Sequence, residues 1–355
     1  MILVFGKSAS AQDIEQASQR LNALGLAHQS VRTENTTQFV ILDDVSTVAS
    51  HLFTQLPGVE KAVRVDSQLS LTLKKAAATV TLANGTVIGG AEPVIIAGPC
   101  SVESEAHIVH VAHQVKESGA TVLRGGAFKP RTSPYDFQGL GLAGMQHLSV
   151  ARAATGLPVV SEVMAPHQVA ESEPFLDVFQ IGARNMYNYD LLREVGRASK
   201  PVLLKRAMSA TLGEWLSSAE YIMLEGNLQV ILCERGIRTF ETHTRNTLDL
   251  AGVAAVKQMC QLPVIVDPSH GTGRPELVRP MAMAAIACGA DGVMIEVHNQ
   301  PAEAMSDREQ AITPQALSEI IEEIRILAAT LRGKNTFPHK PVTYGAPRSQ
   351  ALPQT

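Results

Sequence analysis

The 355-residue chain has few cysteines, no long apolar stretch and no large excess of charge, and each shortage excludes a class of protein. Its four cysteines show no CxxC spacing, and its first residues lack the basic segment and apolar core of a signal peptide. We therefore expect a reducing, cytoplasmic setting. No apolar run approaches the roughly 18–20 residues of a membrane span. The net charge of −4 indicates neither a nucleic-acid nor a membrane surface.

Short apolar runs, each followed by a helical stretch, fill the C-terminal three-quarters of the chain. They begin at Val94, Val122, Val159, Phe179, Val202, Val230, Val264 and Val293. Such runs are typical of parallel strands that are buried on both faces. Eight of them over about 240 residues predict a (β/α)8 barrel, in which the chemistry lies at the C-terminal ends of the strands.

The remaining segments predict a second, smaller domain. Residues 1–66 alternate in the order βαββαβ, which is typical of a ferredoxin-like α+β domain. It could be a regulatory domain or a module for solubility or oligomerisation. Residues 67–92 are predicted to form a linker and a hairpin around Asn84-Gly85. The barrel is then expected over 93–333, and the proline-rich residues 334–355 are expected to form a mobile tail.

Three of the predicted strands end in residues that could bind a metal. Cys100 follows the first strand, His270 follows the seventh, and Glu296 ends the eighth. These strands are neighbours in a closed barrel, so a thiolate, an imidazole and a carboxylate converge. Cys100 alone would more often be an inert buried cysteine. The neighbouring His270 and Glu296 favour a divalent-metal site instead.

Cationic residues follow the second, fourth, fifth and sixth predicted strands. They are Arg124, Lys129, Arg131, Arg184, Lys205, Arg206 and Arg235. So many cations at one barrel mouth predict a substrate with several phosphate or carboxylate groups. Lys205 could instead be a Schiff-base lysine, but the metal ligands opposite favour an anion-binding role. Arg206 alternates with Lys205 and could point outward into a structural salt bridge.

Several segments of the predicted barrel resemble 3-deoxy-D-arabino-heptulosonate 7-phosphate (DAHP) synthases. They are residues 97–104, 123–134, 180–185, 203–206, 233–240 and 267–270. The small N-terminal domain resembles that of the type I-beta branch, which senses aromatic amino acids. The nearest alternative family is 3-deoxy-D-manno-octulosonate 8-phosphate synthase, which shares the barrel and the phosphoenolpyruvate half-site. That family typically has Lys-Ala-Asn-Arg-Ser where this chain has Lys-Pro-Arg-Thr-Ser at residues 129–133.

The resemblance implies a reaction and a metal site. The family condenses phosphoenolpyruvate with erythrose 4-phosphate, which opens the shikimate pathway. The implied metal ligands are Cys100, His270, Glu296 and Asp307, of which Asp307 is not found by pattern alone. Mixed sulfur, nitrogen and oxygen ligands suit Mn²⁺, Fe²⁺, Co²⁺ or Zn²⁺ better than Mg²⁺.

It also implies the substrate contacts. The phosphoenolpyruvate ligands would be Arg124, Lys129, Arg184, Lys205 and Arg235. Arg131 and Thr132 would bind the phosphate of erythrose 4-phosphate. Lys129, Cys100 and His270 form the expected catalytic set, with Lys129 as the proton donor. Glu162 and Asp267 could orient water or His270, Tyr or Phe could inhibit, and the family suggests a homotetramer.

Overall fold

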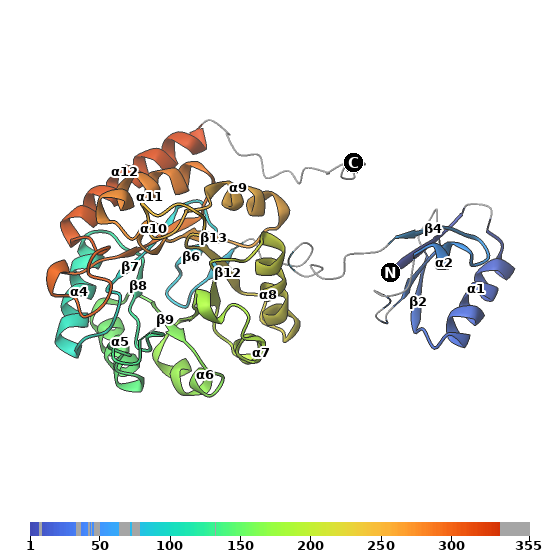
Figure 1. Cartoon of the computed structure of the whole chain (residues 1–355), viewed down its shortest axis with the longest axis horizontal. Coiled ribbons are helices and arrows are strands. Elements are labelled where there is room, and N and C mark those ends of the chain that lie inside the picture. Colours follow the sequence, from blue (N-terminus) through green and yellow to red (C-terminus); the bar gives the residue numbers. More distant parts are fainter. Residues whose placement is uncertain are drawn as a thin grey trace. The chain divides into compact units, whose positions relative to one another are not determined.

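A computed structural model describes residues 1–6, 9–32, 37–41, 43, 45, 50–63, 72, 79–131 and 133–333. The chain divides into two compact units, Met1–Ser70 and Leu71–Thr355 (Figure 1). The predicted tail lies outside the described residues.

The N-terminal unit has one antiparallel sheet. Its elements are β1 (Ile2–Phe5), α1 (Ala11–Ala23), β2 (His28–Arg32), β3 (Thr37–Ile41), α2 (Ser50–Thr54) and β4 (Val59–Val63). The sheet order is β2-β3-β1-β4, and every pairing is antiparallel. This order of elements is the one that the sequence predicts.

Local signals start the first helix, and burial holds it on the sheet. The side chain of Ser10 accepts the N–H of Asp13, and Asp13 accepts the N–H of Ser10, which satisfies two free donors at the start of α1. Leu21 is fully buried beside Phe5 and Phe39, whose rings meet edge to face at 4.8 Å. The sequence predicts the second helix over residues 45–56; the structure describes it over Ser50–Thr54, and residues 46–49 lie outside the described part.

The C-terminal unit is the predicted closed parallel barrel. Its strands are β7 (Val94–Gly98), β8 (Val122–Arg124), β9 (Val159–Val163), β10 (Val178–Ile181), β11 (Val202–Lys205), β12 (Val230–Glu234), β13 (Val264–Val266) and β14 (Gly292–Glu296). The order is β10-β11-β12-β13-β14-β7-β8-β9, so β14 pairs with β7 and closes the ring. The eight apolar runs correspond to these strands because a barrel strand is buried on both faces.

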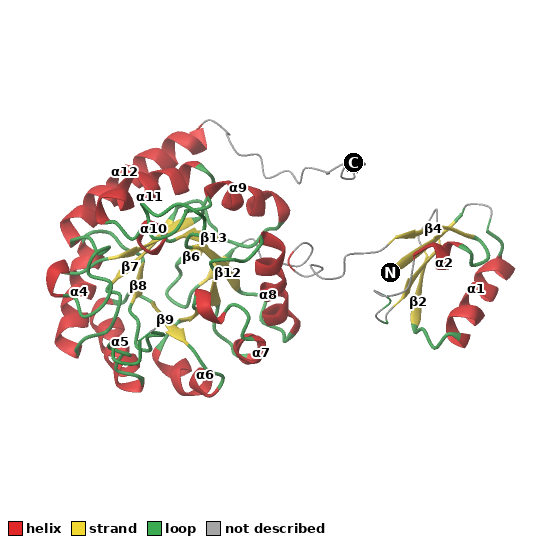
Figure 2. Cartoon of the chain, in the orientation of Figure 1, coloured by secondary structure: helices red, strands yellow, loops and turns green. Residues whose placement is uncertain are grey.

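Helices surround the barrel (Figure 2). They are α4 (Glu105–Glu117), α5 (Leu142–Thr155), α6 (His167–Ser172), α7 (Tyr189–Arg197), α8 (Leu212–Leu224), α9 (Leu250–Met259), α10 (Pro268–Thr272), α11 (Pro275–Ala287) and α12 (Pro314–Gly333). Short 3₁₀ turns occur at Glu173–Phe175, Ala183–Asn185 and Pro301–Glu303. Among the described residues, no helix combines the length and the apolar character that crossing a membrane requires.

A short hairpin packs into the barrel interior. Its strands are β5 (Val80–Thr81) and β6 (Val87–Ile88). Val80, Leu82 and Ile88 join one buried cluster with inward-facing strand residues such as Ile96 and Ile265. The hairpin therefore extends the apolar core of the barrel interior.

Candidate active site

Four potential metal ligands converge at one edge of the barrel. They are Cys100, His270, Glu296 and Asp307, and one ligand atom from each lies within 4.8 Å of the others. Cys100 lies just beyond β7, Glu296 ends β14, and His270 lies in the short helix α10 that follows β13. Because β13, β14 and β7 are hydrogen-bonded neighbours, their C-terminal ends bring these three side chains together. Asp307 reaches them from the loop after β14.

The ring of His270 is oriented to accept a cation. Its Nδ1 lies 2.7 Å from Oδ2 of Asp267, an acceptor-only group, so the neutral ring carries its proton on Nδ1. Burial lowers the pKa of His270, and although Asp267 and Glu296 oppose this, the net pKa lies below its ordinary value. The lone pair of Nε2 then faces Oε1 of Glu296 at 3.2 Å. Two acceptors at that distance favour a cation between them, so this donor set fits a metal.

Cys100 is a protonated thiol when no metal replaces its proton. Burial, followed by the charge of Glu296, raises the pKa of Cys100 to about 12. Its Sγ donates to Oδ2 of Asp307 at 2.9 Å. Burial raises the pKa of Asp307, but this hydrogen bond and His270 outweigh it and hold the pKa well below its usual range. The ionised carboxylate and the thiol therefore suit a divalent cation that binds with release of the thiol proton.

Lys129 links the metal-ligand cluster to the cationic side of the site. Its Nζ donates to the carbonyl oxygen of Cys100 at 3.0 Å and to Sγ at 2.8 Å. Burial lowers the pKa of Lys129, but Cys100 and Glu296 raise it above its ordinary value. Lys129 is therefore an ammonium ion at neutral pH, which can donate a proton.

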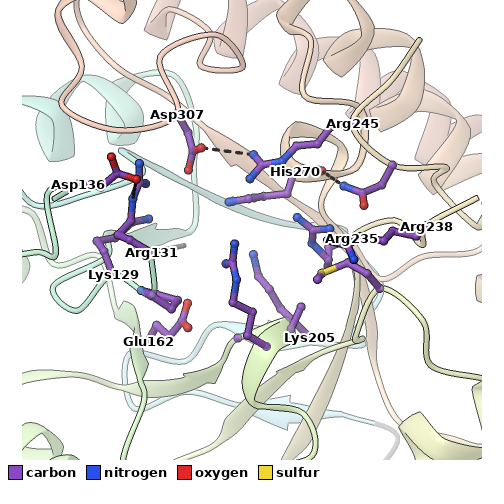
Figure 3. A pocket seen from close by; sticks show the side chains of 16 residues that line it. Lys129, Arg131, Asp136, Glu162, Lys205, Arg235, Arg238, Arg245, His270 and Asp307 are labelled. Atoms are coloured by element: carbon purple, nitrogen blue, oxygen red, sulfur yellow. Dashed lines mark hydrogen bonds and ion pairs between the residues drawn. The ribbon is translucent and has the colours of Figure 1, made fainter. Parts of the chain in front are cut away.

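A cavity of about 280 Å³ opens beside the cluster. Figure 3 shows Lys129, Lys205 and Arg235 pointing into the same space, together with His270 and Asp307. Arg131 and Arg184 also line this cavity. Nη1 of Arg235 is buried with no hydrogen-bond partner among the residues that the structure describes, and burial lowers the pKa of Arg235. An unpaired buried guanidinium nitrogen at a cavity wall favours an anionic ligand.

Carboxylates within the protein pair with several of these cations, which the sequence did not predict. Arg124 donates to Glu296 at 2.8 Å. Lys205 donates to Asp267 at 2.6 Å, and Arg131 lies 3.4 Å from Asp136. The mouth is therefore less electropositive than a count of its cations suggests. Lys129, Arg184 and Arg235 remain without a carboxylate partner among the described ion pairs.

Asp267 and Glu162 lie where the sequence suggested supporting roles. Asp267 is fully buried and bridges Lys205 to His270, so it fixes both side chains. Glu162 lines the cavity, and burial raises its pKa. Its Oε2 accepts from Gln180, whereas its Oε1 is buried and finds no partner within the described part of the chain. Glu162 could therefore hold a proton or a water molecule close to the substrates.

Other sequence expectations concerned residues near the site. Arg206 points away from the cavity and pairs with Glu234 and Asp249, as expected for a structural salt bridge. Cys233 packs in the barrel core. Thr132 lies outside the described residues.

His298 follows Glu296 closely but belongs to a second cluster with Glu103 and His107. Its Nε2 lies 3.5 Å from Glu103, and its Nδ1 accepts the N–H of Gln300. The neutral ring therefore carries its proton on Nε2, the nitrogen that faces Glu103. A metal would need a lone pair on that nitrogen, so this cluster is better suited to holding two loops together.

Sequence reasoning missed two residues beside the metal ligands. Gln310 is almost fully buried and donates through Nε2 to Oε2 of Glu296 at 2.5 Å. Arg245 donates to Oε1 of Gln310 at 2.8 Å and to Oδ1 of Asp307 at 3.3 Å. Both lie on long loops outside the strand pattern, and no periodicity in the sequence identifies them.

Comparison with known proteins agrees with this architecture. The family model described as "DAHP synthetase I family" matches residues 71–330, and that described as "DAHP synthase ferredoxin-like domain" matches residues 1–67. A phospho-2-dehydro-3-deoxyheptonate aldolase from Thermotoga maritima is 43% identical, over 93% of this chain and 98% of its own. A 2-dehydro-3-deoxyphosphooctonate aldolase from Syntrophotalea carbinolica is 31% identical, over 69% of this chain and 94% of its own.

Solved structures give the same relation. The crystal structure of the Thermotoga maritima phospho-2-dehydro-3-deoxyheptonate aldolase superposes with a TM-score of 0.74 at 40% identity, covering 93% of this chain and 97% of that one. A truncated form of the 3-deoxy-D-arabino-heptulosonate 7-phosphate synthase from the same organism has a TM-score of 0.69 at 41% identity, covering 74% and 98%. The chain therefore belongs to the DAHP synthetase I family, and it is an enzyme, a transferase that condenses phosphoenolpyruvate and water with erythrose 4-phosphate to give 3-deoxy-D-arabino-heptulosonate 7-phosphate and phosphate.

Proposed function

We propose that Cys100, His270, Glu296 and Asp307 hold the divalent metal on which this enzyme family depends, and that the adjoining cations bind both substrates. The observation that carries the proposal is the convergence of four S, N and O donors at the edge of a cation-lined cavity. The donor set favours Mn²⁺, Fe²⁺, Co²⁺ or Zn²⁺. When bound, such an ion would act as a Lewis acid on the aldehyde of erythrose 4-phosphate.

The cationic side chains would orient phosphoenolpyruvate. Arg184 and Arg235 have no carboxylate partner among the described ion pairs, so they suit its phosphate. Lys205, Arg124 and Lys129 lie closer to the metal ligands and would bind its carboxylate or complete the phosphate site. Arg131 would bind the phosphate of erythrose 4-phosphate together with Thr132.

Proton transfer would depend on Lys129. C3 of phosphoenolpyruvate attacks the aldehyde carbon, and the developing alkoxide needs a proton. Lys129 is charged and lies against Cys100, so it is placed to donate that proton. Water then adds at C2, and phosphate leaves with cleavage of its bond to that carbon. Glu162, whose pKa burial raises, is placed to accept a proton from that water.

One assay tests the metal site and the substrate assignment together. Loss of phosphoenolpyruvate is followed with erythrose 4-phosphate or arabinose 5-phosphate, in untreated, chelated and Mn²⁺-restored enzyme. We expect chelation to abolish turnover, Mn²⁺ to restore it, and erythrose 4-phosphate to be strongly preferred. Full activity after rigorous metal removal would reject the proposed site. A comparable kcat/KM with the pentose phosphate would transfer the chain to the octulosonate branch.

Borohydride separates the metal-dependent reaction from a Schiff-base aldolase. Nζ of Lys205 is held by Asp267 at 2.6 Å, an arrangement that suits anion binding better than attack on a carbonyl. We therefore expect reduction in the presence of substrate to trap no adduct on Lys205, as judged by intact-protein mass.

The N-terminal unit would supply regulation. The first compact unit, Met1–Ser70, contributes none of the proposed site residues. We propose that it senses Tyr, Phe or both, and that the enzyme is a cytoplasmic homotetramer. A ligand of this kind inhibits when it favours the domain arrangement that binds substrate less well.

A further inference from the structure

Both carboxylates of the proposed metal site have one oxygen directed to the other ligands and one directed away. Oε1 of Glu296 faces His270 at 3.2 Å and also accepts from Arg124 at 2.8 Å. Oδ2 of Asp307 faces Cys100 at 2.9 Å. Oε2 of Glu296 accepts from Gln310, and Oδ1 of Asp307 accepts from Arg245. The outward oxygen of each ligand is thus occupied by one member of a hydrogen-bonded pair, Arg245 and Gln310.

The carboxamide of Gln310 satisfies both of its neighbours at once. Its neighbours are an acceptor-only carboxylate on one side and a donor-only guanidinium on the other. The amide therefore has a single orientation, with Nε2 toward Glu296 and Oε1 toward Arg245. Its side chain is 2% exposed, so water does not replace these bonds. A Glu here would face Glu296 with a second carboxylate, and an apolar residue would leave Arg245 with one partner fewer.

The backbone around Arg245 joins two of the ligand-bearing segments. Arg245 N–H donates to the carbonyl oxygen of Thr272 at 2.9 Å, and the side chain of Asn246 donates to the carbonyl oxygen of His270 at 3.1 Å. The guanidinium of Arg245 then reaches Asp307, across the cavity mouth (Figure 3). It therefore ties the segment that carries His270 to the loop that carries Asp307.

Asp307 needs this support because its backbone is strained. Its φ of 47° is the one positive value at a non-glycine residue among the described residues. A left-handed conformation is unfavourable for a residue that carries a Cβ, so surrounding contacts have to maintain it. The N–H of Gln310 donates to the carbonyl oxygen of Asp307 at 3.2 Å, so Gln310 supports Asp307 through the main chain as well.

We infer that Arg245 and Gln310 are positioning residues that restrict Glu296 and Asp307 to one metal-facing oxygen each, and thereby set the affinity and coordination number of the metal site. This inference rests on the proposed metal site. Outer residues of this kind fix the direction of a ligand's lone pairs. A released carboxylate would rotate or bind through both oxygens, which favours larger ions with more ligands.

The test measures metal binding rather than turnover. Apoenzyme of Arg245→Met and Gln310→Leu is titrated with Mn²⁺ and Zn²⁺ against a competing chelator. We expect each variant to bind about 10- to 100-fold more weakly than the unsubstituted protein. Arg245→Lys, which keeps a cation near Gln310, should recover part of the loss. With Co²⁺ bound, the visible absorption should change shape because the geometry of the site changes, while the thiolate charge-transfer band of Cys100 remains.

Arg274→Met is the matched control. Its side chain is 39% exposed, against 40% for Arg245, and it pairs with Glu276 without touching a proposed ligand. It should leave metal affinity unchanged. Circular dichroism and urea unfolding check that Gln310→Leu folds. If it does not fold, Arg245→Met still tests the inference, because Arg245 is more exposed and its substitution disturbs the core less.

Two results would overturn the inference. The first is metal affinity in Arg245→Met and Gln310→Leu equal to that of Arg274→Met. The second is an Arg245→Met variant with unchanged metal affinity and a raised KM for one substrate, which would make Arg245 a substrate ligand. His270→Ala separates the two levels of the argument. If His270→Ala still binds metal normally, the proposed site itself is wrong. If His270→Ala loses metal binding but Arg245→Met binds metal as tightly as the unsubstituted protein, only the positioning role is rejected.

Discussion

At the scale of single residues, a hydrogen bond to one polar atom of a side chain fixes the direction in which its other polar atom points. His270 faces the ligand cluster through Nε2 because Asp267 holds Nδ1. Burial raises the pKa of Asp267, but His270 and Lys205 outweigh it and hold the pKa well below its usual range. Asp267 therefore remains a carboxylate and connects a proposed metal ligand to a proposed substrate ligand.

Arg131 should act on one substrate only. In Arg131→Ala we expect the KM for erythrose 4-phosphate to rise by about 10- to 100-fold, since one charge-assisted contact contributes roughly 1.5–3 kcal/mol. The KM for phosphoenolpyruvate and the metal affinity should change little. Initial-rate kinetics with each substrate varied in turn give the comparison. Arg193→Ala, which removes an exposed pair with Asp190, is the control. Equal rises in both KM values would contradict the assignment.

The buried thiol of Cys233 predicts weaker folding at alkaline pH. Burial raises the pKa of Cys233 from 9.0 to about 12. The folded chain thus keeps a proton that the unfolded chain loses above pH 9, so stability is complete below pH 9 and falls as the pH rises toward 12. Each such thiol contributes a slope of up to roughly 1.4 kcal/mol per pH unit. Urea unfolding of apoenzyme at pH 8 to 10.5 should show a shallower decline for Cys233→Ala than for the parent.

At the scale of elements, the site depends on how closely β7 approaches β8. Gly98 ends β7 with a φ of 151°, and a Cβ there would lie 2.0 Å from the carbonyl oxygen of Arg124. Two residues later the chain presents Cys100, whose carbonyl oxygen accepts from Arg124 at 3.2 Å. A glycine at this point allows the two strand ends to bring a proposed metal ligand and a cation together.

Gly98→Ala should therefore abolish or greatly weaken folding. We expect a loss above about 4 kcal/mol, because the obstacle is main chain and cannot move aside. Gly156→Ala is the matched substitution, with a φ of 73° and no atom within 4 Å of the added Cβ. It should cost about 1–2 kcal/mol, from the left-handed conformation alone. Urea unfolding gives both values, and similar losses in the two variants would show that the strand contact does not matter.

At the scale of the whole molecule, the proposed chemistry lies in one of the two units. The proposed site residues all lie between Cys100 and Asp307, within the second unit. The truncated Thermotoga maritima synthase, matched by 74% of this chain, has itself been solved.

Truncation before Thr79 should leave a folded, active and metal-dependent enzyme that no longer responds to Tyr or Phe. The full-length chain measured in parallel should be inhibited by at least one of them. Rates of phosphoenolpyruvate loss at increasing amino-acid concentration make the comparison. Unchanged inhibition of the truncated form would place the effector site in the barrel. Indifference of the full-length enzyme would leave the first unit with a structural role.

The sequence by itself determined the barrel and most of the proposed metal-ligand set. Apolar runs in the sequence predict strands that are buried on both faces. Closure of the barrel makes the ends of β13, β14 and β7 neighbours. The convergence of Cys100, His270 and Glu296 can therefore be predicted from the order of the strands in the sequence. Asp307 required resemblance, because it lies on a loop with no periodic pattern. The tertiary structure alone decided which charges pair. Arg245 and Asp307 are 62 positions apart, and Arg124 and Glu296 are 172 apart. Such pairs depend on the distance and direction between loops, which only the closed ring of strands sets.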